Sequence, residues 1–293
     1  MEKIGLIGRG FVGEAVLQGM RHAFHVCWHD PYVQRWSPES NSRCHKLADL
    51  LESVDGPIFL CLPTPMLPTG TADISIVEDV IKQIYDIEWD KEVGDDKVLI
   101  IKSTVPPGTT ETLNKNYHAA VQCVFNPEFL REATSIEDFK NQDRIIIGGP
   151  HKAVSVVKKM YQTAYPEVPT TKTSSTIAEM VKYVTNCFLA TKVAFANEIS
   201  QICEKLDIDY DKVIEYATKD KRLGVSHWAV PGPDGHAGYG GKCFCKDLNA
   251  LISVAHQLKV WSTVMEAAWD KNLEVRPERD WEEIPGVISK GEI

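Results

Sequence analysis

The sequence lacks three features, each of which would place it in a particular class of protein. No apolar run reaches the roughly 18 to 20 residues that a membrane-spanning helix needs. Basic residues are not in excess, because 41 Asp and Glu outweigh 32 Lys and Arg for a net charge of −9, and phosphate contacts to nucleic acid need a basic surface. Internal repeats and low-complexity tracts are also missing. We expect a globular protein that binds neither membranes nor nucleic acids.

The cysteines are scattered, and their spacing fits no disulfide framework. The chain has 8 of them, and such thiols are typical of a reducing compartment. The first residues, Met1 to Gly5, lead directly into an apolar strand without the layout of a signal peptide. We therefore expect reduced thiols and a cytoplasmic protein.

Histidines and cysteines are dense in one short region, which raises the question of a metal site. They are His22, His25, Cys27, His29, Cys44 and His45. Their spacing matches no zinc template, so we expect no bound metal.

The order of the elements predicts an α/β fold with two domains, and 293 residues suffice for both cores. Apolar strands alternate with helical patterns through the first half of the chain. The strands are expected at residues 3–7, 23–28, 57–62, 98–101, 121–125 and 144–147. This alternation is typical of a Rossmann-type, doubly wound parallel sheet. The polar segment 170–175 is the expected boundary, with a sheet domain at 1–172 and an all-helical domain at 173–293.

A glycine pattern follows the first strand and opens a helix. It consists of Gly8, Gly10 and Gly13 around Phe11 and Val12. In such a pattern the first glycine makes the tight turn, the second admits a pyrophosphate and the third packs helix on strand, while the helix N-terminus faces the phosphates. We expect these five residues to bind a dinucleotide.

An acidic residue ends the second strand at the place where such folds bind ribose. Asp30 lies 17 residues after Gly13, close to the expected spacing of about 20. Its charge would repel a 2′-phosphate, which favours NAD over NADP. Arg35 is the nearest cation that would argue otherwise, but it lies beyond Pro31.

Polar residues follow three of the other strands. They are Thr64, Thr104 and the segment Asn126-Pro127-Glu128. Ligands of an open α/β sheet bind beyond the carboxyl ends of its strands. We expect these residues to line one crevice.

A long helix is predicted from Thr176 to about Leu206, and the segment from Thr176 to Glu179 has the form of a capping box. An apolar stripe recurs at helical spacing: Ile177, Met180, Val181, Val184, Phe188 and Phe195. Lys182 and Asn186 are four residues apart and share a face. Because the stripe offers more apolar surface than one domain covers, we expect a homodimer.

The run from Gly240 to Asp247 places Cys243 behind a glycine bend and a carboxylate four residues later. Glycines let the backbone approach a substrate closely. A free cysteine thiol has a pKa of about 8.5. A nucleophilic thiol therefore needs positive potential nearby, which Lys242, Lys246 and the start of a helix can supply. A thiol that holds an acyl group, together with a hydride-accepting cofactor, can oxidise an alcohol past the aldehyde.

Five blocks of the chain resemble the UDP-glucose/GDP-mannose dehydrogenase family, in the family's order. The likeness extends from Lys3 to about Leu273, and the blocks are residues 103–109, 126–132, 143–148, 179–186 and 239–247. The resemblance implies that NAD-dependent oxidation converts the C6 hydroxyl of a nucleotide sugar, UDP-glucose foremost, to a carboxylate in two steps.

The resemblance also implies roles for individual residues. Cys243 would form a thiohemiacetal and then a thioester, Lys182 and Asn186 would hold the oxyanion, and Asp247 would order a water and transfer a proton. Thr104, Glu128 and Glu132 would position the hydrolytic water. Three residues would also contact the cofactor: Thr64, Thr104 and Glu132. The implied substrate contacts are Phe129, Leu130, Arg131, Lys182, Asn186, Tyr239, Gly240 and, across a dimer interface, Arg222.

The chain departs from the family in two respects. The family usually carries a third α/β domain for the substrate's nucleotide, and we expect this chain to lack it, either as a shortened or as a compact version. Cys245 stands where the family commonly has proline, and Lys242 where it has a small residue. A disulfide between Cys243 and Cys245 would be strained, so we expect Cys245 to be a bystander.

Two alternatives remain open from the sequence. A two-electron hydroxyacid dehydrogenase also pairs a Rossmann domain with a helical domain and uses a Lys-x-x-x-Asn pair, but it has no need of Cys243. A non-catalytic NAD-binding paralogue is the other alternative. The retention of Cys243, Lys182, Asn186, Asp247 and Thr104 favours an enzyme.

Overall fold

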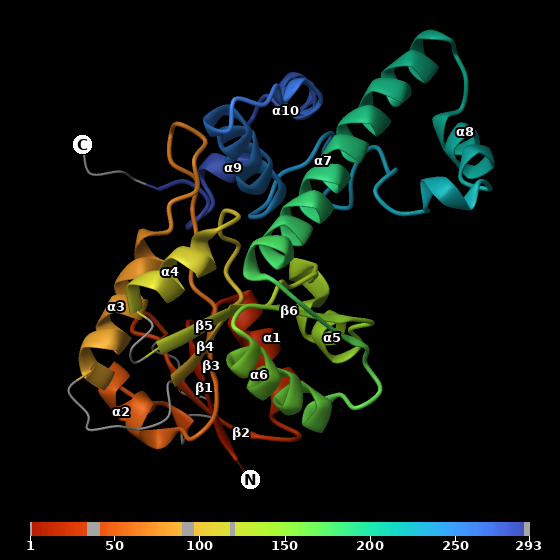
Figure 1. The fold of residues 1–293 in the computed structure, drawn as a ribbon. Coiled ribbons are helices and arrows are strands. Elements are labelled where there is room, and N and C mark those ends of the chain that lie inside the picture. The colour runs from red at the N-terminus through yellow and green to blue at the C-terminus, as the bar shows by residue number, and fades with distance from the viewer. Residues whose placement is uncertain (1, 34–41, 90–96, 118–120, 290–293) are drawn as a thin grey trace. The chain divides into compact units, whose positions relative to one another are not determined.

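A computed structural model describes residues 2–33, 42–89, 97–117 and 121–289, and it contains two compact units (Figure 1). The sheet unit comprises residues 1–64 and 74–182, and the helical unit comprises residues 65–73 and 183–293. The division therefore falls within a helix, whereas the sequence places it at residue 172.

The sheet unit contains a seven-stranded sheet in the order β2-β1-β3-β4-β5-β6-β7. The strands are β1 (Lys3–Ile7), β2 (His25–His29), β3 (Ile58–Leu60), β4 (Lys97–Ile101), β5 (Val121–Phe125), β6 (Ile145–Gly148) and β7 (Thr170–Thr173). All neighbouring strands are parallel except β5 and β6, which pair antiparallel. The predicted α/β class is confirmed, with one antiparallel pair that the sequence did not reveal.

Strand β7 occupies most of the polar segment 170–175, which we expected to form the boundary between the domains. These residues pair in register with β6, from Ile145 opposite Thr170 to Gly148 opposite Thr173. The strand is polar because it lies at the edge of the sheet, where Thr171 and Lys172 are exposed. Without apolar side chains to bury, it shows no hydrophobic pattern.

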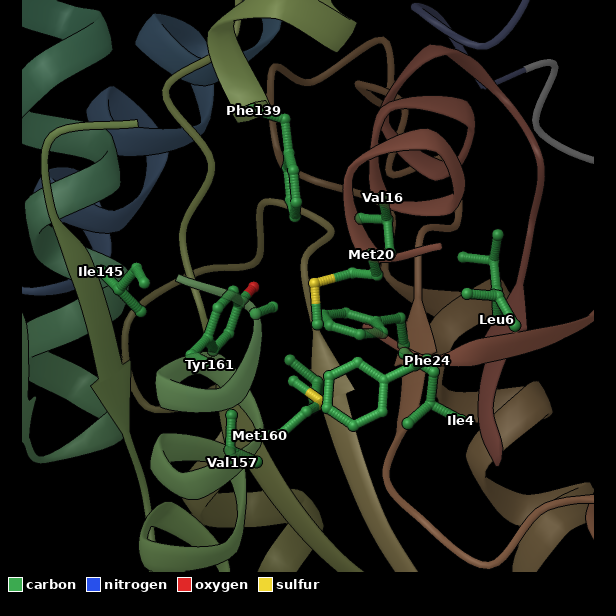
Figure 2. Close-up of a cluster of buried hydrophobic side chains, with 14 of the residues drawn as sticks. Ile4, Leu6, Val16, Met20, Phe24, Phe139, Ile145, Val157, Met160 and Tyr161 are labelled. Carbon is green, nitrogen blue, oxygen red and sulfur yellow. The ribbon is translucent and has the colours of Figure 1, made fainter. Parts of the chain in front are cut away.

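Helices cover both faces of the sheet, and two separate cores result. One face carries α1 (Phe11–Met20), α5 (Ser135–Lys140) and α6 (His151–Ala164), and the other carries α2 (Leu47–Ser53), α3 (Ser75–Trp89) and α4 (Thr109–Tyr117). Alternate residues of a strand point to opposite faces, so Leu6 belongs to the first core and Ile7 to the second. Figure 2 shows part of the first core, where Met20, Phe24 and Met160 gather beside Tyr161.

The helical unit is built from most of α7 (Ser175–Lys205) with α8 (Tyr210–Ala217), α9 (Phe244–Gln257) and α10 (Thr263–Val275). Its core draws on α7, α9 and α10 and includes the buried Trp281. Residues 65–73 belong to this unit, since Met66 N donates to the Val287 carbonyl oxygen at 2.7 Å and Ser289 Oγ donates to Asp73 at 2.7 Å. None of the helices in the described part of the chain is long and apolar enough to span a membrane.

The predicted capping box at the start of α7 is wrong. The helix begins at Ser175, and Ile177 N donates to the Ser174 hydroxyl at 3.3 Å. The Glu179 carboxylate instead accepts from Gly108 N at 2.6 Å and from Thr110 N at 2.8 Å. It thereby satisfies free amides at the start of α4, a tertiary partner that competes with the local one.

Candidate functional site

The glycine loop between β1 and α1 packs tightly against neighbouring backbone. Gly8 has φ +86°, and a Cβ there would overlap the Cys61 carbonyl oxygen. A Cβ at Gly13 would overlap the Gly8 carbonyl oxygen, so the helix starts in tight contact with the loop. A Cβ at Gly10 would meet nothing within 4 Å, which leaves open space in front of the α1 N-terminus. Phe11 and Val12 form the first turn there and are partly exposed.

Asp30 is held rigidly against this loop at the end of β2. Its Oδ2 accepts from Arg9 N at 2.7 Å, and its Oδ1 accepts from Tyr32 N at 2.8 Å and Val33 N at 3.2 Å. Oδ2 accepts only one of these bonds, so it keeps a further lone pair for a ribose hydroxyl. The predicted NAD residues of the loop and Asp30 thus come together, whereas Arg35 lies outside the described residues.

The guanidinium of Arg9 is already engaged beside this site. Its Nε donates to Glu14 at 2.7 Å, and its Cζ lies 4.5 Å from the centre of the Trp28 ring. Glu14 lies in the first turn of α1, where the helix dipole favours an acid.

Lys182 and Glu128 form a buried ion pair within the sheet unit. The Lys182 ammonium donates to both the Glu128 carbonyl oxygen and its Oε1, each at 2.7 Å. Burial alone would raise the pKa of Glu128, but the charge and hydrogen bond of Lys182 outweigh it and lower that pKa. Glu128 is therefore an anion inside the protein, positioned by a cation from α7.

A second buried lysine, which the sequence analysis passed over, lies behind this pair. Lys102 Nζ donates to Asn126 Oδ1 at 2.9 Å, and the Tyr161 hydroxyl donates to the same oxygen at 2.6 Å. Burial lowers the pKa of Lys102 to about 8, despite the nearby Glu128 carboxylate. The available signal was a lysine placed directly after the apolar strand β4.

The remaining predicted residues of the sheet unit differ in exposure. Thr64 and Thr104 are buried in the segments that follow β3 and β4. Phe129 lies between two cations, with the Arg144 Cζ at 4.3 Å and the Lys182 Nζ at 5.9 Å from its ring centre. Glu132 is exposed at the start of a short 3-10 helix (Glu132–Thr134).

Leu130 and Arg131 follow Phe129 and point to different partners. Leu130 N donates to Glu128 Oε2 at 2.8 Å, and the Leu130 side chain packs against the first core. Arg131 lies at the surface in a forked pair with Asp138, and this pair lowers the pKa of Asp138 to about 2. The guanidinium of Arg131 is therefore occupied by a neighbour.

In the helical unit, Cys243 stands at the start of α9 as its N-cap residue and is partly exposed. Asp247 follows one turn later and is 1% exposed, with its amide donating to the Cys243 carbonyl oxygen at 2.9 Å. Its Oδ2 accepts from Asn186 Nδ2 at 2.6 Å, and its Oδ1 accepts from Lys246 Nζ. The amide of Asn186 and the carboxylate of Asp247 are thus hydrogen-bonded side chain to side chain, and the backbone of the first turn of α9 links Asp247 to Cys243.

The neighbours of Cys243 are placed differently. Cys245 is fully buried, and its thiol donates to the Tyr239 carbonyl oxygen at 3.6 Å. Burial raises the pKa of the Cys245 thiol. Tyr239 has its side chain in the helical core, where the hydroxyl donates to the Ala268 carbonyl oxygen at 3.2 Å. Arg222 is exposed, in the short 3-10 helix Lys221–Leu223, and pairs with Asp220.

One unbroken helix connects these two groups in sequence. Lys182 and Asn186 lie one turn apart on α7, and both are buried. Lys182 is paired with Glu128, and Asn186 with Asp247. An ammonium and an amide one turn apart are suitable donors for a developing oxyanion.

No group of three His, Cys, Asp or Glu side chains in the described residues is arranged to hold a metal ion. Two of the histidines that the sequence analysis considered have other neighbours. His22 Nε2 lies 2.9 Å from the Ala164 carbonyl oxygen, and His29 Nδ1 lies 3.0 Å from that of Cys44.

Two domains described for one protein family match the chain. The NAD binding domain of the UDP-glucose/GDP-mannose dehydrogenase family matches residues 48–165, and the central domain of the same family matches residues 176–274. The UDP-glucose 6-dehydrogenase YwqF of Bacillus subtilis is 39% identical over 205 residues, which are 68% of this chain and 44% of that protein. The chain spans about half the length of the curated relatives it matches.

Solved structures have the same fold. A UDP-glucose dehydrogenase from Pyrobaculum islandicum superposes with a TM-score of 0.82 at 28% identity, over 94% of this chain and 68% of that one. The 3-hydroxyisobutyrate dehydrogenase of Mycobacterium tuberculosis superposes with a TM-score of 0.73 over 95% of both chains. Its identity is 14%, so this likeness concerns the fold alone.

Proposed function

This chain belongs to the UDP-glucose/GDP-mannose dehydrogenase family, and from this premise we propose that it oxidises the C6 hydroxyl of a nucleotide sugar to a carboxylate with NAD. UDP-glucose is the proposed substrate, since it is the substrate named for relatives that are 35 to 39% identical to this chain. The proposal differs from simple alcohol oxidation in requiring a covalent intermediate on Cys243.

One observation carries the proposal: α7 presents Lys182 and Asn186 one turn apart, and each is paired with a carboxylate from a different motif. The partner of Asn186 is Asp247, in the helix that begins at Cys243. A structural helix gains little from burying two such polar groups, because each must be desolvated. Their burial is understandable if they serve a reaction.

The proposed steps follow from the chemistry of these side chains. NAD, when bound, supplies the hydride acceptor for each of the two oxidations of C6. Lys182 Nζ and Asn186 Nδ2 donate hydrogen bonds to the C6 oxygen as its negative charge develops. Asp247 accepts the proton that leaves the hydroxyl.

Cys243 then adds to the aldehyde carbon. A C–S bond forms, the thiol proton passes to the C6 oxygen, and the product is a thiohemiacetal. Loss of the remaining C6 hydrogen as hydride and of the hydroxyl proton leaves a thioester. Water held near Glu128 adds to the thioester carbon, the C–S bond breaks, and the carboxylate leaves while the thiol is restored.

A two-electron hydroxyacid dehydrogenase is a second candidate, because such enzymes also use a Lys-x-x-x-Asn pair, which Lys182 and Asn186 match. Such an activity would need no thiol, so alkylation of Cys243 separates the two candidates.

The decisive experiment measures stoichiometry. The protein is incubated with NAD and UDP-glucose, NADH is followed by absorbance, and the uronate is quantified by mass spectrometry. We expect two NADH for each uronate formed. One NADH for each substrate consumed, with an aldehyde or ketone as product, would reject the proposal.

We also propose that the protein forms a homodimer through α7. Large apolar side chains along this helix and directly after its end are 36 to 65% exposed: Ile177, Met180, Val184, Phe188, Phe195, Ile202 and Leu206. An apolar face of this extent is typical of an interaction site. A second copy would cover it and would bring Arg222 of each chain toward the other.

Replacement of Phe188 by Glu tests the dimer. We expect Phe188→Glu to give a monomer by light scattering at micromolar concentration, because a charge would have to be buried in the interface. Val156→Glu is the control, since Val156 is 45% exposed on α6 in the sheet unit. A monomeric wild-type protein would reject the dimer.

A further inference from the structure

The glycine loop that precedes Cys243 is held by side chains from α10. Asn272 makes a reciprocal pair with the backbone of Tyr239: Tyr239 N donates to Asn272 Oδ1 at 2.7 Å, and Asn272 Nδ2 donates to the Tyr239 carbonyl oxygen at 2.9 Å. Asn272 is fully buried, so these bonds are shielded from water. The pair resembles one rung of a β-ladder in which a side chain replaces a strand.

A second side-chain amide, Asn197 of α7, holds the residue before Tyr239. Gly238 N donates to Asn197 Oδ1 at 3.1 Å, and Gly238 has φ +69°. A Cβ at Gly238 would overlap Asn272 Oδ1. Glycine is therefore required both by the backbone conformation and by the close approach of Asn272.

Arg276, one turn after Asn272, forms a wall beside the next glycine. Its guanidinium donates to Asp280 at 2.6 and 2.9 Å and to Asp234 at 2.8 Å, and it is 2% exposed. A Cβ at Gly240 would lie 2.5 Å from its Nη2. Burial opposes the charge of Arg276, but the two carboxylates outweigh it and raise its pKa.

These contacts end three residues before the thiol. Gly240 is followed by Gly241, Lys242 and Cys243, and Cys243 begins α9. A glycine loop of this kind has little rigidity of its own, because glycine allows many backbone conformations. The position of the sulfur at the helix start thus depends on how firmly the preceding backbone is fixed.

We propose that Asn272 and Arg276 are positioning residues, which hold the loop from Gly238 to Gly240 so that the Cys243 sulfur stays at the N-terminus of α9. The catalytic consequence rests on the proposed function, in which Cys243 is the nucleophile. Neither residue touches the reacting atoms in this scheme. Both act through the loop backbone.

The experiment compares Asn272→Ala with wild type in the full chain. Cys243 is alkylated with iodoacetamide between pH 6 and 10, and the modified peptide is quantified by mass spectrometry. A helix N-terminus favours the thiolate, so we expect the midpoint of the rate profile to move up by about one pH unit in the variant, a tenfold slower reaction at neutral pH. We expect kcat for uronate formation to fall about 10- to 100-fold with little change in KM for NAD, because the thiol is misplaced while the cofactor site is intact.

Ser262→Ala is the matched control. Ser262 is a buried hydroxyl at the other end of α10 and donates to Glu266 at 2.6 Å. This variant should lose some thermal stability but keep the wild-type alkylation profile and kcat. If the substitutions acted only by destabilising α10, both variants would show the same change in alkylation profile and kcat.

Arg276→Lys is a second variant, in case Asn272→Ala does not fold. It keeps the cation between Asp234 and Asp280 but removes the planar fork beside Gly240, and we expect about a threefold loss of kcat. A folded Asn272→Ala or Arg276→Lys protein with the wild-type profile and kcat would overturn the inference. Inactivity of the wild type toward nucleotide sugars would reject the proposed function, whereas the alkylation comparison would still test the positioning.

Discussion

The two glycine loops of this protein are held in different ways. In the sheet unit, the loop from Gly8 to Gly13 packs on backbone: the atoms nearest to a Cβ at Gly8 or Gly13 are the carbonyl oxygens of Cys61 and Gly8. In the helical unit, the loop from Gly238 to Gly240 packs on side chains, those of Asn272 and Arg276. A backbone-held loop tolerates change in the surrounding side chains, whereas a loop held by side chains can be altered by one substitution on a distant helix.

The difference matches the proposed tasks of the loops. A cofactor phosphate binds backbone amides and a helix dipole, which need no particular side chain. A nucleophilic thiol needs one sulfur in one place, so its loop is held by specific polar contacts. The predictions below test this distinction, from the largest expected effect to the smallest.

Removal of the Cys243 thiol should abolish the reaction while leaving NAD binding at the other glycine loop intact. We expect Cys243→Ala to lower the rate of uronate formation at least about a thousandfold, because no acyl intermediate can form. NAD affinity, measured by fluorescence quenching, should stay within about twofold of the wild-type value, since the loop from Gly8 to Gly13 is unchanged. Appreciable uronate formation by this variant would contradict the thioester scheme.

In the loop from Gly8 to Gly13, the effect of a glycine-to-alanine substitution on stability should depend on which atoms lie beside the added methyl group. Gly13→Ala places a Cβ against the Gly8 carbonyl oxygen, and we expect a loss of about 3 kcal/mol in the free energy of unfolding and weaker NAD binding. Gly10→Ala has open space around its Cβ, so stability should be nearly unchanged while NAD affinity falls. Urea unfolding and NAD titration measure both effects, and equal stability of the two variants would show that the loop is not held by backbone contact.

The buried cations of the two units sharpen the comparison. Arg276 has two carboxylate partners and a raised pKa, whereas the partner of Lys102 is the Asn126 amide and the pKa of Lys102 falls to about 8. Between about pH 8 and 10.5 the unfolded chain therefore binds more protons at Lys102 than the folded one, so its contribution to stability rises with pH and is lost as pH falls through 8.

Lys102→Met removes this titration. We expect the free energy of unfolding of wild type, relative to Lys102→Met, to rise by about 2 kcal/mol between pH 7 and pH 10. Comparing the two proteins cancels the titration of buried cysteines, such as Cys61, whose pKa burial raises to about 12. Parallel stability curves for the two proteins would mean that Lys102 is not buried as a cation.

The smallest effect concerns two glycines of the second loop region with similar conformations. Gly238 and Gly235 have φ of +69° and +82°, but only Gly238 lies against Asn272 Oδ1. Both Ala variants should lose about 1 kcal/mol from backbone strain, and Gly238→Ala about 1 kcal/mol more from the contact. Thermal unfolding of both variants measures the difference, and equal losses would argue against a tight fit of Asn272.

Sequence patterns predicted most of the fold where a local rule and the tertiary structure agree. The strand at Val121–Phe125 was placed at its observed bounds, and the helix predicted from Thr176 to Leu206 is α7 within one residue at either end. The prediction failed where a tertiary partner competes with a local one, as for Glu179, and where an edge strand has no apolar residues to reveal it, as for β7.

Site residues can be predicted from the sequence when they belong to a recognisable motif. The glycine pattern, Asp30 and the pair on α7 belong to this group, and the structure places each on the expected element. The sequence did not reveal the roles of Lys102, Asn272 and Arg276. A polar residue in a helix or after a strand is usually exposed, and nothing in its neighbouring sequence shows that it is buried. The partners of these three residues, Asn126, Tyr239 and Asp234, lie 24 to 42 residues away in the chain.

The sequence by itself determined the alternation of strands and helices, the glycine turn before α1 and the one-turn spacing of Lys182 and Asn186, since each depends on residues within a few positions of one another. Only the tertiary structure decided which carboxylate each of these two residues meets, that Glu179 serves α4 and that α10 holds the loop before Cys243. The physical reason is that a hydrogen bond or an ion pair depends on distance in space. Burial, which sets the strength of these contacts, arises only when distant segments pack together.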